Sequence, residues 1–209
     1  MTGGKFITLE GGEGVGKSTQ LAALAAALRQ RGLSVVTTRE PGGTEGAEAI
    51  RALLLTGDEA RWDARSEALL FAAARGDHVA KLIAPALARG DWVLSDRFVD
   101  STRAYQGGGG GLSDADIMDL HRIGSRGLLP DRTLLLTLAP GAAAERLAAR
   151  DGGQADRMGA KPADYQARLA ARFAELAATE PGRWRTIAAD GASSDVTAAL
   201  MAALADLLP

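Results

Sequence analysis

The 209-residue chain contains no cysteine, which excludes disulfide bonds, thiolate nucleophiles and cysteine-ligated metal sites. It has only two histidines, His78 and His121, too few for a histidine metal centre. Any catalysis must therefore use carboxylates, arginines, lysines and hydroxyl groups.

The chain also lacks an excess of either charge, since it carries 24 basic and 26 acidic side chains. Such a balance does not predict a nucleic-acid or anionic membrane partner. The longest apolar stretches, such as 21–29 (LAALAAALR), are amphipathic and far shorter than the roughly 20 residues of a membrane span. The N-terminus reaches Glu10 before an apolar export segment could form. We expect a soluble, cytoplasmic protein.

The length suits one α/β domain over residues 1–209. Short apolar segments alternate with longer helical patterns, which is typical of βαβ units around a mostly parallel sheet. Strands are expected at 5–9, 33–38, 91–95, 132–138 and 184–189. Helices are expected at 17–31, 44–55, 64–89, 113–126, 162–179 and from Ser193 or Ser194 to about 207.

Several residues predict where these helices begin, end or bend. Thr44 and Ser113 are expected N-caps, and Gly32 is expected to end the first helix. Within 64–89, a break is expected at Gly76 and Asp77 and a kink at Pro85. Residues 150–161 contain glycine and charge without an apolar period, which predicts a mobile loop between two helices.

The segment 9–20 (LEGGEGVGKSTQ) contains the pattern G-x-x-x-x-G-K-[ST] between an expected strand and an expected helix. Glycines let backbone N–H groups surround phosphates, Lys17 reaches the β and γ oxygens, and Ser18 can hold Mg²⁺. The alternative is a glycine-rich turn before a lysine, but the chain has only four lysines. The expected nucleotide-binding residues here are Gly11, Gly12, Glu13, Gly14, Val15, Gly16, Lys17, Ser18 and Thr19.

A carboxylate that completes the Mg²⁺ site should end a neighbouring strand, and Asp96 follows the strand 91–95. The alternative role for this acid is to form a turn or a cap. No lysine lies in an N-K-x-D sequence, which disfavours a GTPase, and a motor or pump usually needs a larger chain. A small kinase remains, in which arginines such as Arg97 bind the accepting phosphate.

Five stretches together are more specific: 10–19 (EGGEGVGKST), 38–44 (TREPGGT), 71–75 (FAAAR), 95–107 (SDRFVDSTRAYQG) and 146–157 (RLAARDGGQADR). Over about residues 5–190 the chain resembles bacterial thymidylate kinases. The resemblance implies a P-loop NMP-kinase fold: a five-stranded parallel sheet flanked by helices, with a mobile lid at about 146–161. It also implies a homodimer that transfers the γ-phosphoryl group of ATP to dTMP with Mg²⁺.

The resemblance assigns roles to residues of the acceptor site. Phe71 matches the aromatic on which thymine stacks, and Arg75, one helical turn later, matches the arginine that donates to a thymine carbonyl. The alternatives are a core phenylalanine and a solvated arginine, although the chain has only three Trp, two Tyr and four Phe. Arg39 and Arg97 would hold the acceptor phosphate, because guanidinium groups suit bidentate phosphate contacts.

The remaining acceptor residues follow from the same resemblance. Pro41 would lie near the thymine methyl group, Thr102 at the pyrimidine edge, and Tyr105 where a ribose 2′-OH would be. Gln106 lies beside Tyr105 in the sequence, and Ser101 is a further acceptor contact. The alternative for this segment is an ordinary strand-to-helix connection.

Glu13 is unexpected inside a phosphate loop, since phosphates repel a carboxylate unless it faces away or shares a cation. Its position matches the acid that reaches the 3′-OH of the acceptor sugar. The alternative is a solvent-facing loop residue.

The lid distinguishes two types of this family. Positions 12–15 contain no arginine, whereas Arg146, Arg150 and Arg157 lie in or beside the expected lid, so the chain resembles the lid-arginine type. Arg150 is expected to close on the transferring phosphoryl group and Arg146 to lie near adenine; solvated loop charges are the alternative. Gly159 and Gln154 stand where the family usually has acids.

Three hypotheses follow. The first is a dTMP kinase whose catalytic residues are Lys17, Asp96, Arg97 and Arg150. The second is a P-loop kinase for another nucleoside monophosphate or a small metabolite. The third is a regulatory module that binds ATP and transfers nothing, which Arg39, Asp96 and Arg97 argue against.

Overall fold

The computed structural model describes residues 3–139 and 163–209. The expected lid at 146–161, with Arg146, Arg150 and Arg157, lies outside the described residues.

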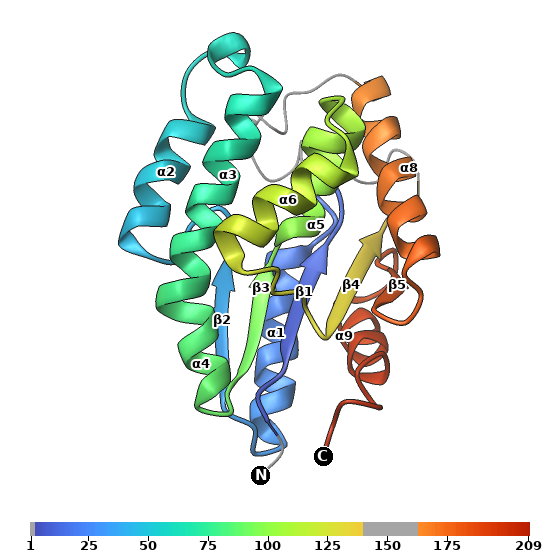
Figure 1. Ribbon diagram of the computed structural model, residues 1–209. Coiled ribbons are helices and arrows are strands. Elements are labelled where there is room, and N and C mark those ends of the chain that lie inside the picture. Colours follow the sequence, from blue (N-terminus) through green and yellow to red (C-terminus); the bar gives the residue numbers. More distant parts are fainter. Residues whose placement is uncertain (1–2, 140–162) are drawn as a thin grey trace.

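The centre of the molecule is a five-stranded sheet with the strand order β2-β3-β1-β4-β5 (Figure 1). The neighbouring strands β1 and β3, β1 and β4, β2 and β3, and β4 and β5 all pair in parallel. The strands are β1 (Phe6–Glu10), β2 (Val35–Arg39), β3 (Trp92–Asp96), β4 (Arg132–Thr137) and β5 (Trp184–Ala188). Each of the five strand predictions is confirmed to within two residues at either end.

Helices cover both faces of the sheet (Figure 1). The helices are α1 (Lys17–Gln30), α2 (Glu45–Leu55), α3 (Ala64–His78), α4 (Ala84–Ala88), α5 (Val99–Thr102), α6 (Asp114–Ser125), α8 (Ala163–Thr179) and α9 (Ser193–Ala202). A 3₁₀ turn, η1 (Glu59–Arg61), and two π-helical segments, η2 (Val79–Ile83) and η3 (Arg103–Gly109), complete the described elements.

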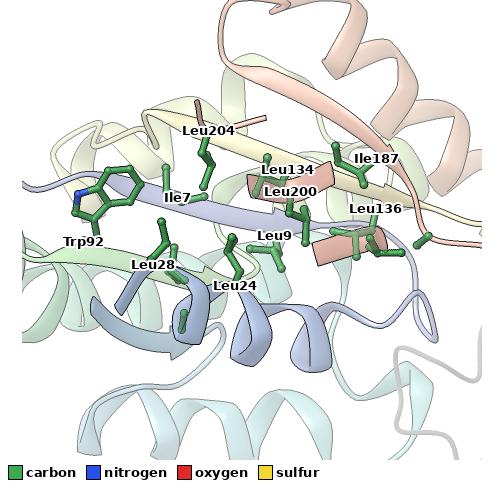
Figure 2. Close-up of a cluster of buried hydrophobic side chains, with 14 of the residues drawn as sticks. Ile7, Leu9, Leu24, Leu28, Trp92, Leu134, Leu136, Ile187, Leu200 and Leu204 are labelled. Carbon is green, nitrogen blue, oxygen red and sulfur yellow. The ribbon is translucent and has the colours of Figure 1, made fainter. Parts of the chain in front are cut away.

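Alternate residues of the strands pack against different helices, because successive side chains point to opposite faces. Ile7 and Leu9 of β1 pack with Leu24 and Leu28 of α1 and with Leu200 of α9 (Figure 2). On the other face Phe6 packs with residues of η2, α4 and α6, and a third cluster joins β4 and β5 to η3 and α8. Helices packed on both faces of the sheet hold the strands, and with them the strand ends, in place.

The structure corrects two expectations about helix ends. No break occurs at Gly76 and Asp77: α3 continues to His78 and passes through η2 into α4. Gly76 is instead the place where α3 crosses α6, since a Cβ there would lie 2.8 Å from the carbonyl oxygen of Gly124. Neither Ser193 nor Ser194 caps α9, whose N-cap is Ala192 and which ends at Ala202, before the expected 207.

The other two caps are confirmed. The Thr44 hydroxyl accepts from the Ala47 backbone N–H at 3.3 Å, and the Ser113 hydroxyl accepts from Asp116 at 3.1 Å. Pro85 lies in the first turn of α4, directly after the π-helical segment η2.

The register brings the carboxyl ends of three strands to the same level. Asp96 at the end of β3 pairs with Leu9 of β1 on one side and with Arg39 of β2 on the other. Ligands of open parallel sheets bind at this edge, and the phosphate loop follows β1 here.

Candidate active site

A cavity of about 520 Å³ opens at the carboxyl ends of β1, β2 and β3. All ten residues expected at the acceptor site line it: Glu13, Arg39, Pro41, Phe71, Arg75, Arg97, Ser101, Thr102, Tyr105 and Gln106. Gly14, Gly16, Lys17, Ser18, Thr19 and Asp96 line the same cavity. Four separate stretches of the sequence thus meet in one place.

The phosphate loop has the backbone that its glycines permit. Gly11, Gly14 and Gly16 have φ angles of 133°, 73° and 92°, which L side chains rarely adopt. At Gly11 a Cβ would also lie 2.4 Å from the carbonyl oxygen of Leu136, so the loop packs directly on β4.

Lys17 is held against this loop. Its Nζ donates to the carbonyl oxygens of Gly11 at 3.2 Å and Gly12 at 2.7 Å. Burial, together with the charge of Arg97, lowers the pKa of Lys17 to about 8, while Glu13 and nearby carboxylates oppose the shift. An anion that entered here would favour the charged ammonium.

Ser18 and Asp96 meet as the sequence predicts. The Ser18 hydroxyl, in the first turn of α1, donates to Oδ2 of Asp96 at 2.7 Å. In the described part of the chain no group of three or more His, Cys, Asp or Glu side chains could hold a metal. A hydroxyl and one carboxylate still suit Mg²⁺, which takes one or two carboxylates and obtains other ligands from phosphates and water.

Arg97 lines the cavity in a strained backbone conformation. Its φ is 71°, a left-handed conformation that costs a non-glycine residue about 1–3 kcal/mol. Its guanidinium donates to the Gly11 carbonyl at 3.1 Å, to Ser101 Oγ at 3.0 Å and to the Tyr105 hydroxyl at 3.0 Å. It also forms an ion pair with Glu13. Glu13 therefore shares a cation with the site, and the solvent-facing alternative is wrong.

Glu10 is a site residue that sequence reasoning missed. At the end of β1 its carboxyl accepts from the Phe98 backbone N–H at 2.8 Å and from the Ser101 hydroxyl at 2.6 Å. Burial, reinforced by the charge of Asp100, raises the pKa of Glu10 to about 8. These two hydrogen bonds hold the turn that carries Arg97. The position of an acid directly before the phosphate loop was the available signal.

The opposite end of the cavity contains Arg75 and Phe71 on α3. Arg75 is 2% exposed, so the solvated alternative is wrong. Its Nε donates to Glu40 Oε2 and its Nη2 to Thr102 Oγ1, both at 2.7 Å. Phe71 lines the cavity and also packs against the cluster that contains Tyr105, so it is both a site and a core residue.

Two other expected acceptor residues pair with carboxylates outside the cavity lining. Arg39 donates to both carboxylate oxygens of Glu48, at 2.9 and 3.1 Å, and Gln106 donates to Glu67 at 2.7 Å. Burial raises the pKa of Tyr105, which keeps its hydroxyl neutral.

Four further lining residues were not identified from the sequence: Glu40, Arg51, Leu55 and Phe98. Glu40 lies inside the stretch TREPGGT, so its neighbours were a usable signal. Arg51 donates to the carbonyl oxygen of Pro41 at 2.7 Å. It lies on an ordinary amphipathic helix without a neighbouring motif, so nothing in the sequence marked it as a site residue.

A second cavity of about 310 Å³ lies on the other side of the phosphate loop. It is lined by Gly14, Val15, Gly16, Thr19, Gln20, Ala189, Gly191, Ser193 and Val196. Gln20 fixes its far wall, because its amide donates to Ser193 O at 3.1 Å and accepts from Thr197 at 2.8 Å.

Comparisons with known proteins identify one family. The family model described as thymidylate kinase matches residues 9–200. A thymidylate kinase from Rhizorhabdus wittichii is 61% identical over 206 residues, which is 99% of each chain. One from Chromohalobacter salexigens is 56% identical over 153 residues, which is 73% of this chain and 72% of that protein.

A solved structure shares the fold as well. The crystal structure of thymidylate kinase from Ehrlichia chaffeensis matches with a TM-score of 0.79 and 31% identity, over 97% of this chain and 99% of that one. In the described part of the chain, no helix has the length and apolarity needed to cross a membrane. The chain therefore belongs to the thymidylate kinase family, and it is a nucleoside monophosphate kinase that phosphorylates dTMP to dTDP at the expense of ATP.

Proposed function

We propose that the 520 Å³ cavity holds dTMP with its phosphate toward Arg97, and that the phosphate loop holds the ATP phosphates beside it. One observation carries this assignment. Lys17 Nζ and Arg97 Nη1 donate to the same carbonyl oxygen, that of Gly11, at 3.2 and 3.1 Å. The cation for the donor and the cation for the acceptor are therefore neighbours.

Phosphoryl transfer depends mainly on positioning and on neutralising charge. Lys17 would contact the β and γ oxygens of ATP, and Arg97 with Arg39 would hold the acceptor phosphate in line. The phosphates would offer charge-assisted hydrogen bonds in place of the contacts that these side chains make with Gly11, Glu13 and Glu48.

Ser18 and Asp96 are the residues that would hold Mg²⁺. When bound, the ion would supply positive charge against the charge that develops on the phosphates. Arg150 and Arg146, outside the described residues, are proposed to act from the segment 146–161, the first at the transferring group and the second near adenine.

The base would lie against α3. Two nitrogens of Arg75 are engaged by Glu40 and Thr102, and Nη1 has no hydrogen-bond partner among the described residues. An arginine can only donate, so this nitrogen suits a carbonyl oxygen of thymine. Phe71 would stack on the ring, with Pro41 near its methyl group.

The sugar would lie between Glu13 and Tyr105. The Glu13 carboxylate is an acceptor for the 3′-OH, and the Tyr105 ring fills space beside it. Ser101 and Gln106 complete this part of the wall. The adenosine of ATP is assigned to the second cavity, which adjoins the same phosphate loop at Gly14 and Gly16.

We also propose a homodimer in the cytoplasm, where ATP and nucleotides are available. Leu53 on α2, Leu69 on α3 and Ile123 on α6 are 40%, 55% and 72% exposed. These helices lie side by side in Figure 1, and the exposed apolar side chains would suit a second copy. Leu69→Glu should reduce the molecular mass measured by sedimentation from that of a dimer toward that of a monomer. An unchanged mass would exclude this surface as the dimer interface.

A coupled assay of ADP release across acceptors tests the substrate assignment. We expect dTMP to be the best substrate, and dUMP to be poorer by about 10- to 200-fold, because one methyl group is worth little more. Faster turnover of dCMP or AMP would support the hypothesis of another acceptor. Ser18→Ala and Asp96→Asn should each raise the Mg²⁺ concentration needed for half-maximal rate.

A further inference from the structure

A chain of hydrogen-bonded polar side chains, most of them buried, runs behind the proposed base end of the cavity. His78 Nδ1 lies 3.0 Å from Glu40 Oε1, and His78 Nε2 lies 2.7 Å from Thr38 Oγ1. Glu40 and Arg75 line the cavity, whereas the His78 side chain is completely buried behind them. The roles proposed above leave this histidine without a function.

The direction of the hydrogen bonds is fixed by the chemistry of the groups. A carboxylate oxygen accepts, so Nδ1 of His78 must carry the hydrogen that faces Glu40. In the neutral ring Nε2 then accepts from the Thr38 hydroxyl. On its other oxygen Glu40 accepts from Arg75 Nε, and Arg75 Nη2 donates to Thr102.

Helix geometry explains why His78 and Arg75 share one carboxylate. They are three residues apart on α3 and so lie on the same face of the helix. Glu40, directly after β2, contacts His78 with one oxygen and Arg75 with the other. With both oxygens bound, the carboxylate is held in one orientation, and so is the guanidinium.

The loop after β2 is packed onto the same histidine. A Cβ at Gly43 would lie 2.6 Å from both His78 Nε2 and Thr38 Oγ1. The backbone that follows Pro41 therefore rests directly on the Thr38–His78 pair, which leaves this pair little freedom to move.

We infer that His78 is a positioning residue for base selectivity: through Glu40 it orients Arg75 so that its remaining nitrogen faces the 4-carbonyl of the pyrimidine. The inference rests on the proposed role of Arg75. A site built to hydrogen-bond one group discriminates strongly against an analogue that lacks it. Here the discriminated analogue is dCMP, which has an amino group in place of that carbonyl.

Two substitutions separate the two ends of the imidazole. The amide nitrogen of Asn lies as many bonds from Cα as Nδ1 does and can donate as Nδ1 does, whereas the amide oxygen of Gln lies as many bonds away as Nε2 does and can accept as Nε2 does. His78→Asn can therefore still donate to Glu40, whereas His78→Gln keeps only the end that faces Thr38. The comparison of the two variants distinguishes the effect of the hydrogen bond to Glu40 on base selectivity from the general effect of losing a buried histidine.

The measurement is the ratio of kcat/KM for dTMP to that for dCMP, with the KM for ATP and the Tm of each variant. We expect His78→Gln to lower the ratio about tenfold, as for one charge-assisted hydrogen bond, with the KM for ATP unchanged. His78→Asn should restore most of the ratio. His121→Gln is the matched control for loss of a buried imidazole: Nε2 of His121 donates to Leu128 O, and within the described residues this histidine makes no hydrogen bond to Glu40 or Arg75, so the ratio should stay close to wild type.

Arg75→Ala distinguishes a failure of the proposed role of Arg75 from a failure of the inferred role of His78. If Arg75→Ala lowers the ratio of kcat/KM for dTMP to that for dCMP and a folded His78→Gln leaves this ratio unchanged, the inference is overturned and the role of Arg75 stands. If Arg75→Ala leaves the ratio unchanged, both the role of Arg75 and the inference about His78 are wrong.

Thr38→Val serves if His78→Gln does not fold. It removes one neutral hydrogen bond to the same ring, so the ratio should fall about 2- to 10-fold. An unchanged ratio in Thr38→Val would then overturn the inference.

Discussion

The hydroxyl of Tyr105 accepts a hydrogen bond of 3.0 Å from Arg97, and its ring lies under the same guanidinium, 5.0 Å from the guanidinium carbon to the ring centroid. The residue proposed to recognise deoxyribose is therefore packed against the residue proposed to hold the acceptor phosphate. Substitution of either residue should therefore disturb the other. Comparing deoxyribonucleotide and ribonucleotide substrates distinguishes a loss of deoxyribose recognition from a loss of phosphate binding.

Tyr105→Ala should relax the preference for deoxyribose, because it opens the space where a 2′-OH would lie. The ratio of kcat/KM for dTMP to that for its ribonucleotide is the quantity to measure. Tyr105→Phe is the control: it keeps the ring and removes the hydroxyl, so the ratio should stay close to wild type. Unchanged selectivity in Tyr105→Ala would remove this role.

Lys17→Ala and Arg97→Ala should each lower kcat by about 10²- to 10³-fold, the usual cost of removing one group that stabilises developing charge. Each cation contacts the loop at Gly11, so both variants also need a folding check by Tm. A wild-type rate in either one would contradict the corresponding assignment.

Glu13→Ala should raise the KM for dTMP more than the KM for ATP. The carboxylate pairs with Arg97, on the acceptor side of the phosphate loop, and the proposed contact is the acceptor 3′-OH. Glu13→Gln keeps an oxygen that can accept and should be milder. Equal changes in the two KM values would show that Glu13 serves the loop as a whole.

The raised pKa of Glu10 makes a prediction about stability. The unfolded chain releases this proton near pH 4.5, but the folded chain keeps it until about pH 8. Between these values the folded state binds more protons, so the free energy of unfolding due to Glu10 falls as pH rises. Asp114 and other carboxyls with lowered pKa values act below this window.

Glu10→Gln tests this, since Gln keeps an acceptor for the Phe98 N–H and cannot ionise. The Tm difference between variant and wild type should shift in favour of the variant from pH 4.5 to pH 8. A difference that does not change with pH would contradict burial of an ionisable carboxyl at this position.

Two neighbouring glycines should respond differently to alanine. At Gly11 a Cβ would meet the Leu136 carbonyl at 2.4 Å and φ is 133°, whereas at Gly12 nothing lies within 4 Å. Gly11→Ala should cost about 2 kcal/mol or more of unfolding free energy and raise the KM for ATP. Gly12→Ala should be close to wild type in both; equal losses would refute the packing of Gly11 on β4.

The sequence alone determined the parts that depend on local pattern. The glycines, Lys17 and Ser18 specify a phosphate loop because each acts on its own backbone or on the next turn, and alternation of apolar segments specifies a parallel α/β sheet. The order of motifs was enough to identify the family resemblance and ten residues that line the 520 Å³ cavity.

Only the tertiary structure decided how charges are paired. Glu13 and Arg97 are 84 residues apart, and Arg75 and Glu40 are 35 apart, so no local spacing predicts their contact. The buried roles of Glu10 and His78 have the same cause. Gly76, which looks like a helix breaker in the sequence, lies within a continuous helix, and it is a glycine because the close crossing with Gly124 leaves no room for a Cβ. Propensity acts within a helix, whereas packing between helices decides such positions.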